Sequence, residues 1–552
     1  MSNDTPSTDT APGAPAPAAP IESAAAAPTK TDEGATAATT EVGDIPRHEP
    51  TSVPPPVGPR GRGDRRRDLT RKRRVLTAAG VTVLAGGLVA GGILVPDITA
   101  SADAAGRPAA CVPQDPTRPQ PPAQAPVPTS LSTVQQAYYC LFDNYYGGSR
   151  LDDRKLLQYA FQAVVRELRK RGVDRPNAVL PALTGHRDKD WARFAKRLRE
   201  VLDAVPDDQA LRSSLAVVAI QGMLTALHDN HAAYQPSGPA PGQGAPRWGL
   251  GVSLNYALPR PETAPDFSGP LFATAVAAGG PAALAGLAAG DIIESVDGVP
   301  AFTGGKLNPG VLDLLRPPAS QRTPVTLAIR RPATGETRQL RLTPGELPLP
   351  PQPRVDATVL DGGIARIRFD AFYPGVAQEI LKAITDLRAT TTLTGVIFDV
   401  RGNRGGVADE GNVLLGAFVH DATVISFCDA NGRCEPQRVD DNVPLLSLPM
   451  VTLTDDGCAS ACEVFATGIK DLRLGTLVGT RTAGVNSGPA RLYALNDNTS
   501  AIRFPSQRAI GADGEIVDGI GVPPDIYAPL TAADVSTGKD PALAQATSLL
   551  EH

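Results

Sequence analysis

Ser460 lies at a turn that could present a hydroxyl group for nucleophilic attack. An apolar stretch, residues 450–454, precedes the turn, and a helical pattern begins close to Ser460. A serine between a strand and a helix is exposed, and the N–H groups of the helix start favour negative charge beside it. Serine is also a preferred N-cap residue, and Glu463 has capping-box spacing. The turn alone therefore predicts either a nucleophile or a helix cap.

A second turn, Asp-Val-Arg-Gly-Asn-Arg-Gly-Gly at residues 399–406, ends another predicted strand in two glycines. Gly405 and Gly406 have no side chains that would cover their N–H groups, so this turn can stabilise an oxyanion. A phosphate or dinucleotide loop is the alternative, but the glycine spacing matches neither the nucleotide fingerprint nor the P-loop. We therefore expect an oxyanion-binding turn.

Two of the six histidines, His228 and His231, follow a helical pattern in the segment Leu-His-Asp-Asn-His-Ala-Ala-Tyr. Histidine titrates near neutral pH, so it can take the proton of a serine hydroxyl and return it to a leaving group. A histidine at a helix end is also commonly a C-cap or surface residue. The residue type alone leaves both roles open.

These residues need elements that bring them together. Apolar side chains recur at helical spacing between residues 130 and 234, which predicts a helical domain at 130–240. Further on, strands and helices alternate, which predicts an α/β domain at 350–552 with a partly parallel sheet. Both turns follow strands of this sheet, at the end where ligands usually bind. The expected strands are 363–369, 395–400 and 450–454, and the expected helices are 376–387 and 407–419.

Residues 247–346 consist of short β-like runs punctuated by glycine. They begin with Trp-Gly-Leu-Gly-Val-Ser-Leu and include Gly-Leu-Ala-Ala-Gly-Asp-Ile-Ile-Glu-Ser-Val-Asp-Gly, and they closely resemble a PDZ domain. An unrelated small β domain is the alternative. The resemblance implies that a peptide adds as a strand and that backbone N–H groups bind its terminal carboxylate. The residues expected to bind the peptide are Gly249, Leu250, Gly251 and Val252.

The two turns, the PDZ pattern and the helical segment together resemble the C-terminal processing, or tail-specific, serine peptidase family. The resemblance covers residues 131–529. It implies that Ser460 is the nucleophile. It also implies that the Arg-x-Asn-x-Gly-Gly turn gives one oxyanion N–H, from Gly405 or Gly406, and that Ala461 gives the other.

The sequence departs from the better-known branch of this family, whose general base is a lysine 25 positions after the serine, because that position is Val485 here. Lys470 should lie nearly three helical turns from Ser460, so we expect it to be solvated or salt-bridged. The missing lysine leaves a catalytically inactive PDZ-containing receptor or scaffold as the alternative function.

The segment Asp229-Asn230-His231 instead resembles the Asp-x-His motif of the branch that includes the tricorn protease core. There a histidine is the base, and a late acidic residue partners it. The resemblance implies that His231 activates Ser460 and that Asp518 is the acid, with Glu515 as the fallback. His228 could compete with His231, although its position departs from the motif.

Residues 75–95 are apolar and uncharged, and about 20 such residues suffice to cross a bilayer as a helix. We expect one transmembrane helix there. The basic residues that precede it place residues 1–74 in the cytoplasm and the rest outside, by the positive-inside rule. A signal peptide cleaved within the small residues 99–105 is the alternative. The basic flank consists of Arg65, Arg66, Arg67, Arg71, Lys72, Arg73 and Arg74.

Length and composition agree with this organisation. The 552 residues are enough for three or so domains. Glycine and proline crowd the first 70 residues and residues 106–128, which predicts a disordered tail at 1–74 and a linker at 96–129. The basic cluster adjoins an apolar run and does not interleave with aromatic residues, so we expect no nucleic-acid partner.

All six cysteines follow the apolar run, and their even number indicates disulfides in an exported protein. Cys428 and Cys434 flank a turn-rich segment and would close a hairpin, whereas the pairing of the other four stays open. A bond between Cys458 and Cys462 would stiffen the turn at Ser460. A metal site is disfavoured because no histidines lie at ligand spacing, and we expect no metal or organic cofactor.

The sequence therefore predicts an α+β multidomain protein with a helical domain, a PDZ β domain and an α/β peptidase core, preceded by one transmembrane helix. The resemblance implies a membrane-anchored serine endopeptidase, single-pass in the cell membrane, whose extracytoplasmic part hydrolyses unfolded or C-terminally recognised polypeptides. A peptide substrate bound by the PDZ domain and the membrane are the expected partners.

Overall fold

The computed structural model describes residues 111–114, 125–176, 178–205, 208–236, 247–256, 269–317, 322–348 and 355–551. The predicted tail 1–74, the predicted membrane helix 75–95 and most of the linker 96–129 lie outside these ranges. Within these ranges, no helix combines the length and the apolarity that a membrane span requires. The membrane helix stays a prediction.

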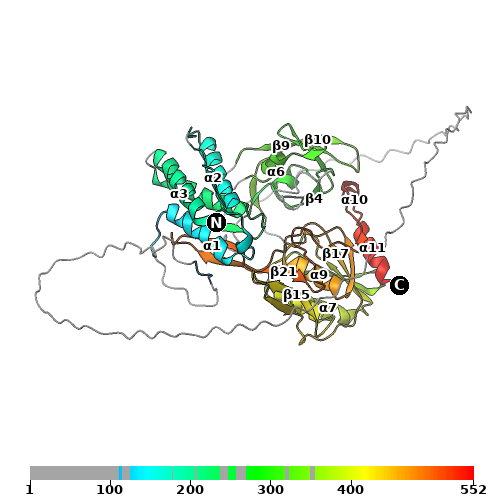
Figure 1. Cartoon of the computed structure of the whole chain (residues 1–552). Coiled ribbons are helices and arrows are strands. Elements are labelled where there is room, and N and C mark those ends of the chain that lie inside the picture. Colours follow the sequence, from blue (N-terminus) through cyan, green and yellow to red (C-terminus); the bar gives the residue numbers. More distant parts are fainter. Residues whose placement is uncertain are drawn as a thin grey trace, which may run out of the picture. The chain divides into compact units, whose positions relative to one another are not determined.

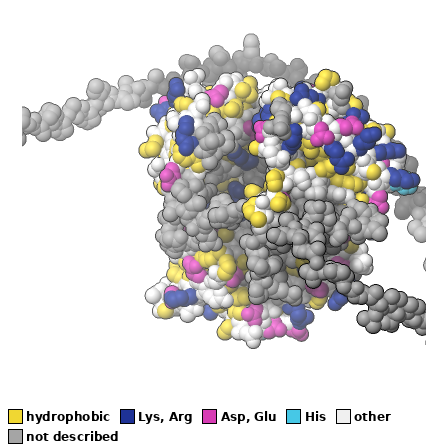
Figure 2. Space-filling view, turned by 90° about the vertical axis from the view of Figure 1, so that its left-hand side faces the viewer, with side chains coloured by type: hydrophobic (Ala, Val, Ile, Leu, Met, Phe, Trp, Pro, Cys, Tyr) yellow, Lys and Arg dark blue, Asp and Glu magenta, His cyan; other side chains and the backbone are white. Residues whose placement is uncertain are grey.

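Helices dominate residues 131–225, as the periodicity predicts (Figure 1). Apolar side chains one turn apart face inward, as Leu157, Phe161, Val164 and Leu168 do in the second long helix. Charged side chains of both signs are interspersed with apolar ones on the face seen in Figure 2. These helices are α1 (Leu131–Asn144), the 3-10 turn η1 (Gly148–Arg150), α2 (Asp153–Lys170), α3 (Arg187–Ala204) and α4 (Gln209–Thr225).

Helix α4 crosses α2 closely and leads to the two histidines. A Cβ atom on Gly222 would lie only 2.6 Å from the carbonyl oxygen of Tyr159, so a glycine is needed at this crossing. After the histidines the chain forms β1 (Ala233–Pro236), which pairs antiparallel with β20 (Ser500–Pro505). This pairing joins the end of the helical part to the C-terminal part of the chain.

The described residues between 247 and 347 form short strands around a separate apolar core, in agreement with the predicted β pattern. The largest sheet here has the order β10-β9-β5-β6, and β2 pairs with β11, β3 with β4, and β7 with β8. The elements are β2 (Arg247–Gly249), β3 (Val252–Leu254), β4 (Ala273–Val276), α5 (Pro281–Leu284), β5 (Ile292–Val296), β6 (Val299–Pro300), β7 (Phe302–Thr303), β8 (Lys306–Leu307), α6 (Pro309–Leu315), β9 (Val325–Arg330), β10 (Thr337–Leu342) and β11 (Gly345–Leu347).

The C-terminal part contains the predicted α/β sheet, with the strand order β12-β13-β14-β17-β18-β22. All neighbours in it are parallel except β12 and β13. The predicted strand 450–454 is observed with the same bounds, and 363–369 and 395–400 are observed to within one residue. The strands are β12 (Val355–Leu360), β13 (Ile364–Phe369), β14 (Gly395–Asp399), β17 (Met450–Thr454), β18 (Gly475–Gly479) and β22 (Ile526–Tyr527).

Helices cover both faces of this sheet. Successive side chains of a strand point to opposite faces, and in β14 all of them are buried, so both faces need a cover. Phe398 packs in the cluster that contains the apolar side chains of α7 (Val376–Thr390) and α9 (Ala461–Asp471). Its neighbour Ile397 packs in a second cluster with α11 (Pro541–Leu550). Helices α7 and α9 connect successive parallel strands by right-handed crossovers in one direction, which accounts for their place on one face. Helix α11 follows the last strand and covers the other face.

The remaining elements flank this sheet. Helix α8 contacts α7 and α9, and β15 pairs with both β16 and β21, while β19 pairs with β20. The bounds are η3 (Asp361–Gly363), α8 (Ala408–Gly416), β15 (Thr423–Cys428), β16 (Cys434–Arg438), β19 (Ala490–Ala494), β21 (Arg508–Gly511) and α10 (Ala532–Ser536).

All six cysteines are paired in disulfides. The predicted bond between Cys428 and Cys434 is confirmed, and it closes the hairpin of β15 and β16. A second bond joins Cys111 to Cys140 of α1 and so attaches the start of the described chain to the helices. The third surrounds Ser460 and is described with the site.

Candidate active site

Ser460 occupies a sharp turn between β17 and α9. Its backbone has φ 58° and ψ −121°, in the left-handed region that non-glycine residues seldom adopt. Its N–H donates to the carbonyl oxygen of Val485 at 2.9 Å and to a carboxylate oxygen of Glu463 at 3.3 Å. The residue is therefore the N-cap of α9, and it also has the strained strand-to-helix turn that is typical of a nucleophilic serine.

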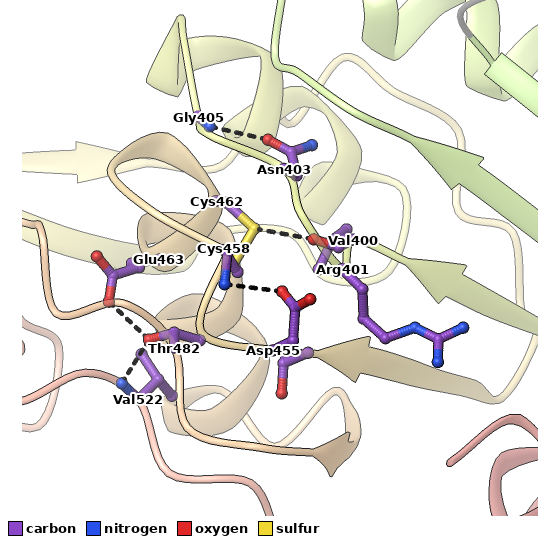
Figure 3. Close-up of a disulfide and its surroundings, with 12 residues drawn as sticks. Val400, Arg401, Asn403, Gly405, Asp455, Cys458, Cys462, Glu463, Thr482 and Val522 are labelled. Atoms are coloured by element: carbon purple, nitrogen blue, oxygen red, sulfur yellow. Dashed lines mark hydrogen bonds between the residues drawn. A yellow bond between two sulfur atoms is a disulfide. The ribbon is translucent and has the colours of Figure 1, made fainter. Parts of the chain in front are cut away.

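Glu463 fixes this turn from inside the protein. It is fully buried and accepts hydrogen bonds from the Thr482 hydroxyl at 2.6 Å and the N–H groups of Gly484 and Val485 at 2.5 and 2.6 Å. Figure 3 shows it beside Thr482. Burial raises its pKa to about 7, against the effect of these hydrogen bonds. The first turn of α9 is thus attached to the loop at residues 482–485.

A disulfide encloses the candidate nucleophile. Cys458 and Cys462 are bonded, with 5.4 Å between their Cα atoms, and both are fully buried (Figure 3). The disulfide-bonded Sγ atom of Cys462 faces the carbonyl oxygen of Val400, just after β14. The bond that the sequence suggested around Ser460 is therefore present, and it ties the turn to the start of α9.

The glycine turn lies directly against Ser460. A Cβ atom on Gly405 would lie 2.8 Å from the Cβ atom of Ser460, so only glycine fits there. The N–H of Gly405 already donates to the Asn403 side chain at 2.9 Å (Figure 3). By contrast, the N–H groups of Gly406 and Ala461 donate to no acceptor among the described residues. Of the three predicted oxyanion donors, Gly406 and Ala461 are therefore the two available ones.

His231 meets Ser460 from the helical part of the chain. Its Nε2 atom lies 3.2 Å from the Ser460 hydroxyl oxygen, across 229 residues of sequence. Burial lowers the pKa of His231 below its usual 6.5, the charge of Arg503 lowers it further, and Asp518 opposes both effects. The imidazole is thus favoured in its neutral form, which can accept a proton from the hydroxyl.

The other ring nitrogen of His231 has a partner that the sequence did not predict. Nδ1 lies 2.8 Å from the hydroxyl oxygen of Ser487, and that hydroxyl donates to Asp229 at 2.9 Å. Asp229 also accepts from the backbone N–H of His231 at 2.9 Å and from the Tyr145 hydroxyl at 3.1 Å. Ser487 stands two residues after Val485, but no local pattern marks it as a partner of a histidine so distant in sequence.

The two predicted acids lie in different surroundings. Asp518 accepts the N–H of Asn486 at 3.1 Å and lies near enough to His231 for its charge to raise the pKa of that imidazole. Glu515 is hydrogen-bonded to Asp471 at the end of α9, and burial together with this contact raises the pKa of Asp471 to about 7. Asp518 is thus the predicted acid that lies near His231, and its role stays a prediction.

Other predicted residues are also accounted for. Lys470 forms an ion pair with Asp525 at 2.6 Å, so the expected salt bridge is confirmed. The ring of His228 packs edge-on against Tyr159 of α2, with 5.8 Å between centroids. In the described part of the chain, no three His, Cys, Asp or Glu side chains converge as metal ligands would.

The predicted peptide-binding loop runs from Gly249 to Val252, between β2 and β3. The carbonyl oxygens of Leu250 and Gly251 accept from the N–H groups of Ala282 and Ala277 at 2.9 and 2.8 Å. The N–H groups of the same two residues donate to no acceptor among the described residues. The loop therefore has the free donors that binding of a carboxylate would require.

Comparison with known proteins identifies two domains. Residues 363–528 match the model of peptidase family S41, and residues 272–331 match that of the PDZ domain. The chain is a serine-type peptidase with a PDZ domain. More particularly, it is related to the carboxy-terminal processing proteases, as the resemblance of its motifs predicts.

Individual relatives differ in how much they share with this chain. It is 29% identical over 350 residues to a carboxy-terminal-processing protease of Bartonella bacilliformis, which covers 61% of this chain and 75% of the relative. It is 29% identical over 385 residues to a tricorn protease homolog of Streptomyces coelicolor, or 65% of this chain and 32% of the relative. A solved photosystem II D1 C-terminal processing protease has 23% identity and a TM-score of 0.44, and covers 75% of this chain and 99% of that one.

Removal of the buried disulfide by the double change Cys458→Ala and Cys462→Ala should lower the free energy of unfolding by about 2 kcal/mol, because a short closed loop is opened. The strained turn is then free to relax, so kcat should also fall, by about 10- to 100-fold. Denaturant unfolding and peptide hydrolysis measure the two effects. The matched control is Cys428→Ala with Cys434→Ala in the surface hairpin, and an equal fall of kcat in both variants would contradict the assigned role.

Proposed function

We propose that this chain is an endopeptidase that cleaves unfolded or C-terminally recognised polypeptides with Ser460 as nucleophile and His231 as general base. The observation that carries the proposal is the 3.2 Å approach of His231 Nε2 to the hydroxyl oxygen of Ser460 beside two unused N–H donors. A nucleophile, a base and oxyanion donors are the minimum set for acyl transfer.

In the first step, His231 takes the proton of Ser460 while the serine oxygen attacks the carbonyl carbon of the scissile peptide bond. The negative oxygen that forms is stabilised by the N–H groups of Gly406 and Ala461. The imidazolium then returns the proton to the leaving amine, which leaves an acyl-enzyme. Water, activated by the same histidine, hydrolyses the acyl-enzyme and restores Ser460.

The PDZ domain supplies binding away from the reacting bond. We propose that residues 249–252 bind the carboxylate at the end of a polypeptide, which is supported by the free N–H groups of Leu250 and Gly251. Binding energy from this remote contact holds the scissile bond near Ser460 and so lowers the barrier. The names of the relatives, carboxy-terminal processing proteases, agree with a substrate recognised at its C-terminus.

We also propose that the chain uses the histidine chemistry of the tricorn-like branch. The apolar Val485 stands where the other branch has its lysine, and Lys470 is held by Asp525, which supports a base other than lysine. The similarity to a tricorn protease homolog agrees with this assignment. Asp518 remains the proposed acid of the site, through its charge near His231.

Degradation of an unfolded protein by the purified full-length chain tests the peptidase. Ser460→Ala and His231→Ala should each lower kcat by about 10⁴-fold or more, because nucleophile and base act as a unit. The control Lys470→Ala removes a different charged side chain of α9 and should keep wild-type kcat. If folded wild-type protein binds C-terminal peptides but cleaves none, the chain is a peptide-binding receptor instead.

The pH dependence of kcat/KM should report the pKa of His231. Only the neutral imidazole accepts the serine proton, so activity should be lost as pH falls through this pKa. Because burial lowers the pKa, the midpoint of the acid limb should lie below 6.5, the usual value for histidine. A profile measured between about pH 4 and 8 that is flat, or whose midpoint lies above 6.5, would exclude His231 as the base.

We propose further that residues 75–95 anchor the chain in the cell membrane with the peptidase outside the cytoplasm. The uncharged run and its basic N-terminal flank support this orientation. The full-length chain should stay in the membrane pellet after alkaline extraction, and its C-terminal part should be cut by added protease in intact cells. Recovery of a shortened, soluble chain that starts near residues 99–105 would instead establish a cleaved signal peptide.

A further inference from the structure

We propose that Asp540, at the start of α11, is a positioning residue that fixes the oxyanion turn at residues 401–406 through the side chain of Arg401. This role rests on the proposed function, because an oxyanion forms only if Ser460 attacks a peptide bond. Asp540 lies outside the motifs of both turns and after the match to the peptidase family, which ends at residue 528.

The oxyanion turn has little stiffness of its own. Three of its six residues are glycines with positive φ, namely Gly402 at 76°, Gly405 at 84° and Gly406 at 144°. Glycine has no Cβ atom to restrict its backbone, so a turn built this way keeps one shape only if its surroundings hold it. The direction of the Gly406 N–H therefore depends on the contacts that the turn makes.

Neighbouring loops of the peptidase domain hold much of the turn. Phe372 donates its N–H to the carbonyl oxygen of Gly405 at 2.9 Å and accepts the N–H of Val407 at 2.7 Å. The N–H of Gly402 donates to a carboxylate oxygen of Asp455 at 2.8 Å. The first residue of the turn is held through its side chain.

Two carboxylates bind the side chain of this first residue, Arg401, which extends away from Gly405 in Figure 3. Its Nε and Nη2 atoms each donate to Asp399 at 2.8 Å. Its Nη1 and Nη2 atoms donate to Asp540 at 2.9 and 2.8 Å. Two bidentate pairs fix both the position and the plane of the guanidinium, and the side chain is only 11% exposed.

Asp399 cannot replace Asp540 in this cluster. It is fully buried and also accepts from Arg366 at 2.6 Å and Arg368 at 3.2 Å, so one carboxylate already serves three guanidinium groups. Burial alone would raise the pKa of Asp399, but the hydrogen bonds and charges of the three arginines hold it below its usual range. Among the described residues, Asp540 forms an ion pair with Arg401 alone. Loss of Asp540 leaves one edge of a largely buried guanidinium unpaired, which favours its movement toward water.

Asp540 is itself held by the helix that it begins. Its side chain caps α11 by accepting the N–H of Leu543 at 3.0 Å. Ala542 and Ala546 of α11 pack in the apolar cluster that contains Ile397 of β14. The docking of α11 on the sheet therefore sets the position of the carboxylate near the end of β14, where the oxyanion turn begins.

Asp540→Ser removes the contact with Arg401 but keeps the helix cap, because serine is also a preferred N-cap residue. The variant should lower kcat by about 10- to 100-fold, since a misplaced Gly406 N–H stabilises the transition state less. KM should change by less than about threefold, because the oxyanion forms only after attack on the substrate. Both constants are measured with the full-length chain and a peptide that the wild type cleaves.

The matched control is Asp152→Ser in the helical part. Asp152 is likewise the N-cap of a helix, α2, and binds Arg154 through two side-chain bonds of 2.9 Å. Its side chain is 29% exposed, against 28% for Asp540. This variant should keep wild-type kcat, and an equal fall of kcat in the two variants would contradict the role of Asp540.

Two further variants test whether Asp540 acts through Arg401. Asp540→Asn keeps the cap and one oxygen acceptor, so its kcat should lie between those of the wild type and Asp540→Ser. Adding Asp540→Ser to Arg401→Gln should lower kcat by less than about twofold beyond Arg401→Gln alone, because the shared contact is already lost. An Asp540→Asn kcat below that of Asp540→Ser, or an undiminished effect of Asp540→Ser in the Arg401→Gln chain, would overturn the proposal.

Hydrogen exchange in the full-length chain reports on the turn without a substrate. The hydrogen-bonded N–H groups of Gly402 and Gly405 should exchange about tenfold faster in Asp540→Ser than in the wild type. In Asp152→Ser they should exchange as in the wild type. Equal exchange in the two variants would refute the hold of Asp540 on the turn, whatever the activity. An inactive wild type whose turn loosens in Asp540→Ser would instead reject the peptidase and keep that hold.

Discussion

The antiparallel pairing of β1 with β20 is the contact on which the site depends. His231 and Ser460 belong to parts of the chain 229 residues apart, and Ala233 opposite Arg503 sets the register that brings the histidine turn to the peptidase domain. Closing so long a loop costs conformational entropy, but this cost grows only slowly with loop length. A few hydrogen bonds between β1 and β20 can offset the extra cost of the long separation. The two-part origin of the site means that it exists only when both parts are folded and paired.

The peptidase domain then has to hold Ser460 in an unfavourable backbone conformation. A positive φ in a serine costs of order 1–3 kcal/mol, and the surroundings must outweigh that cost. Glu463 binds the loop behind the turn, the bond between Cys458 and Cys462 closes the turn itself, and Gly405 allows the oxyanion turn to pack against it. Strain and support are therefore concentrated around a single residue.

Short sequence patterns predicted most of this framework, but they could not predict the contacts between residues far apart in the sequence. The apolar run of β17, the serine at its end and the pair Gly405 and Gly406 are visible in short windows, because strand period and turn chemistry act locally. Which glycine N–H is free depends on the side chain of Asn403, and the partner of His231 Nδ1 depends on a loop 256 residues away. Such choices are set by tertiary packing, which sequence spacing does not encode.

The loop at residues 482–487 contains Val485 at the position where the resemblance to the better-known branch leads one to expect a lysine. The carbonyl oxygen of Val485 accepts the N–H of Ser460, so this position still contacts the nucleophile through its backbone. A lysine base must be desolvated until it loses its proton, whereas a histidine needs only a small shift to be neutral near pH 7. The proposed base, His231, comes from the helical part, and the same loop contacts its Nδ1 atom through Ser487. The proposed histidine base therefore accounts for both the apolar side chain of Val485 and the contact of Ser487 with His231.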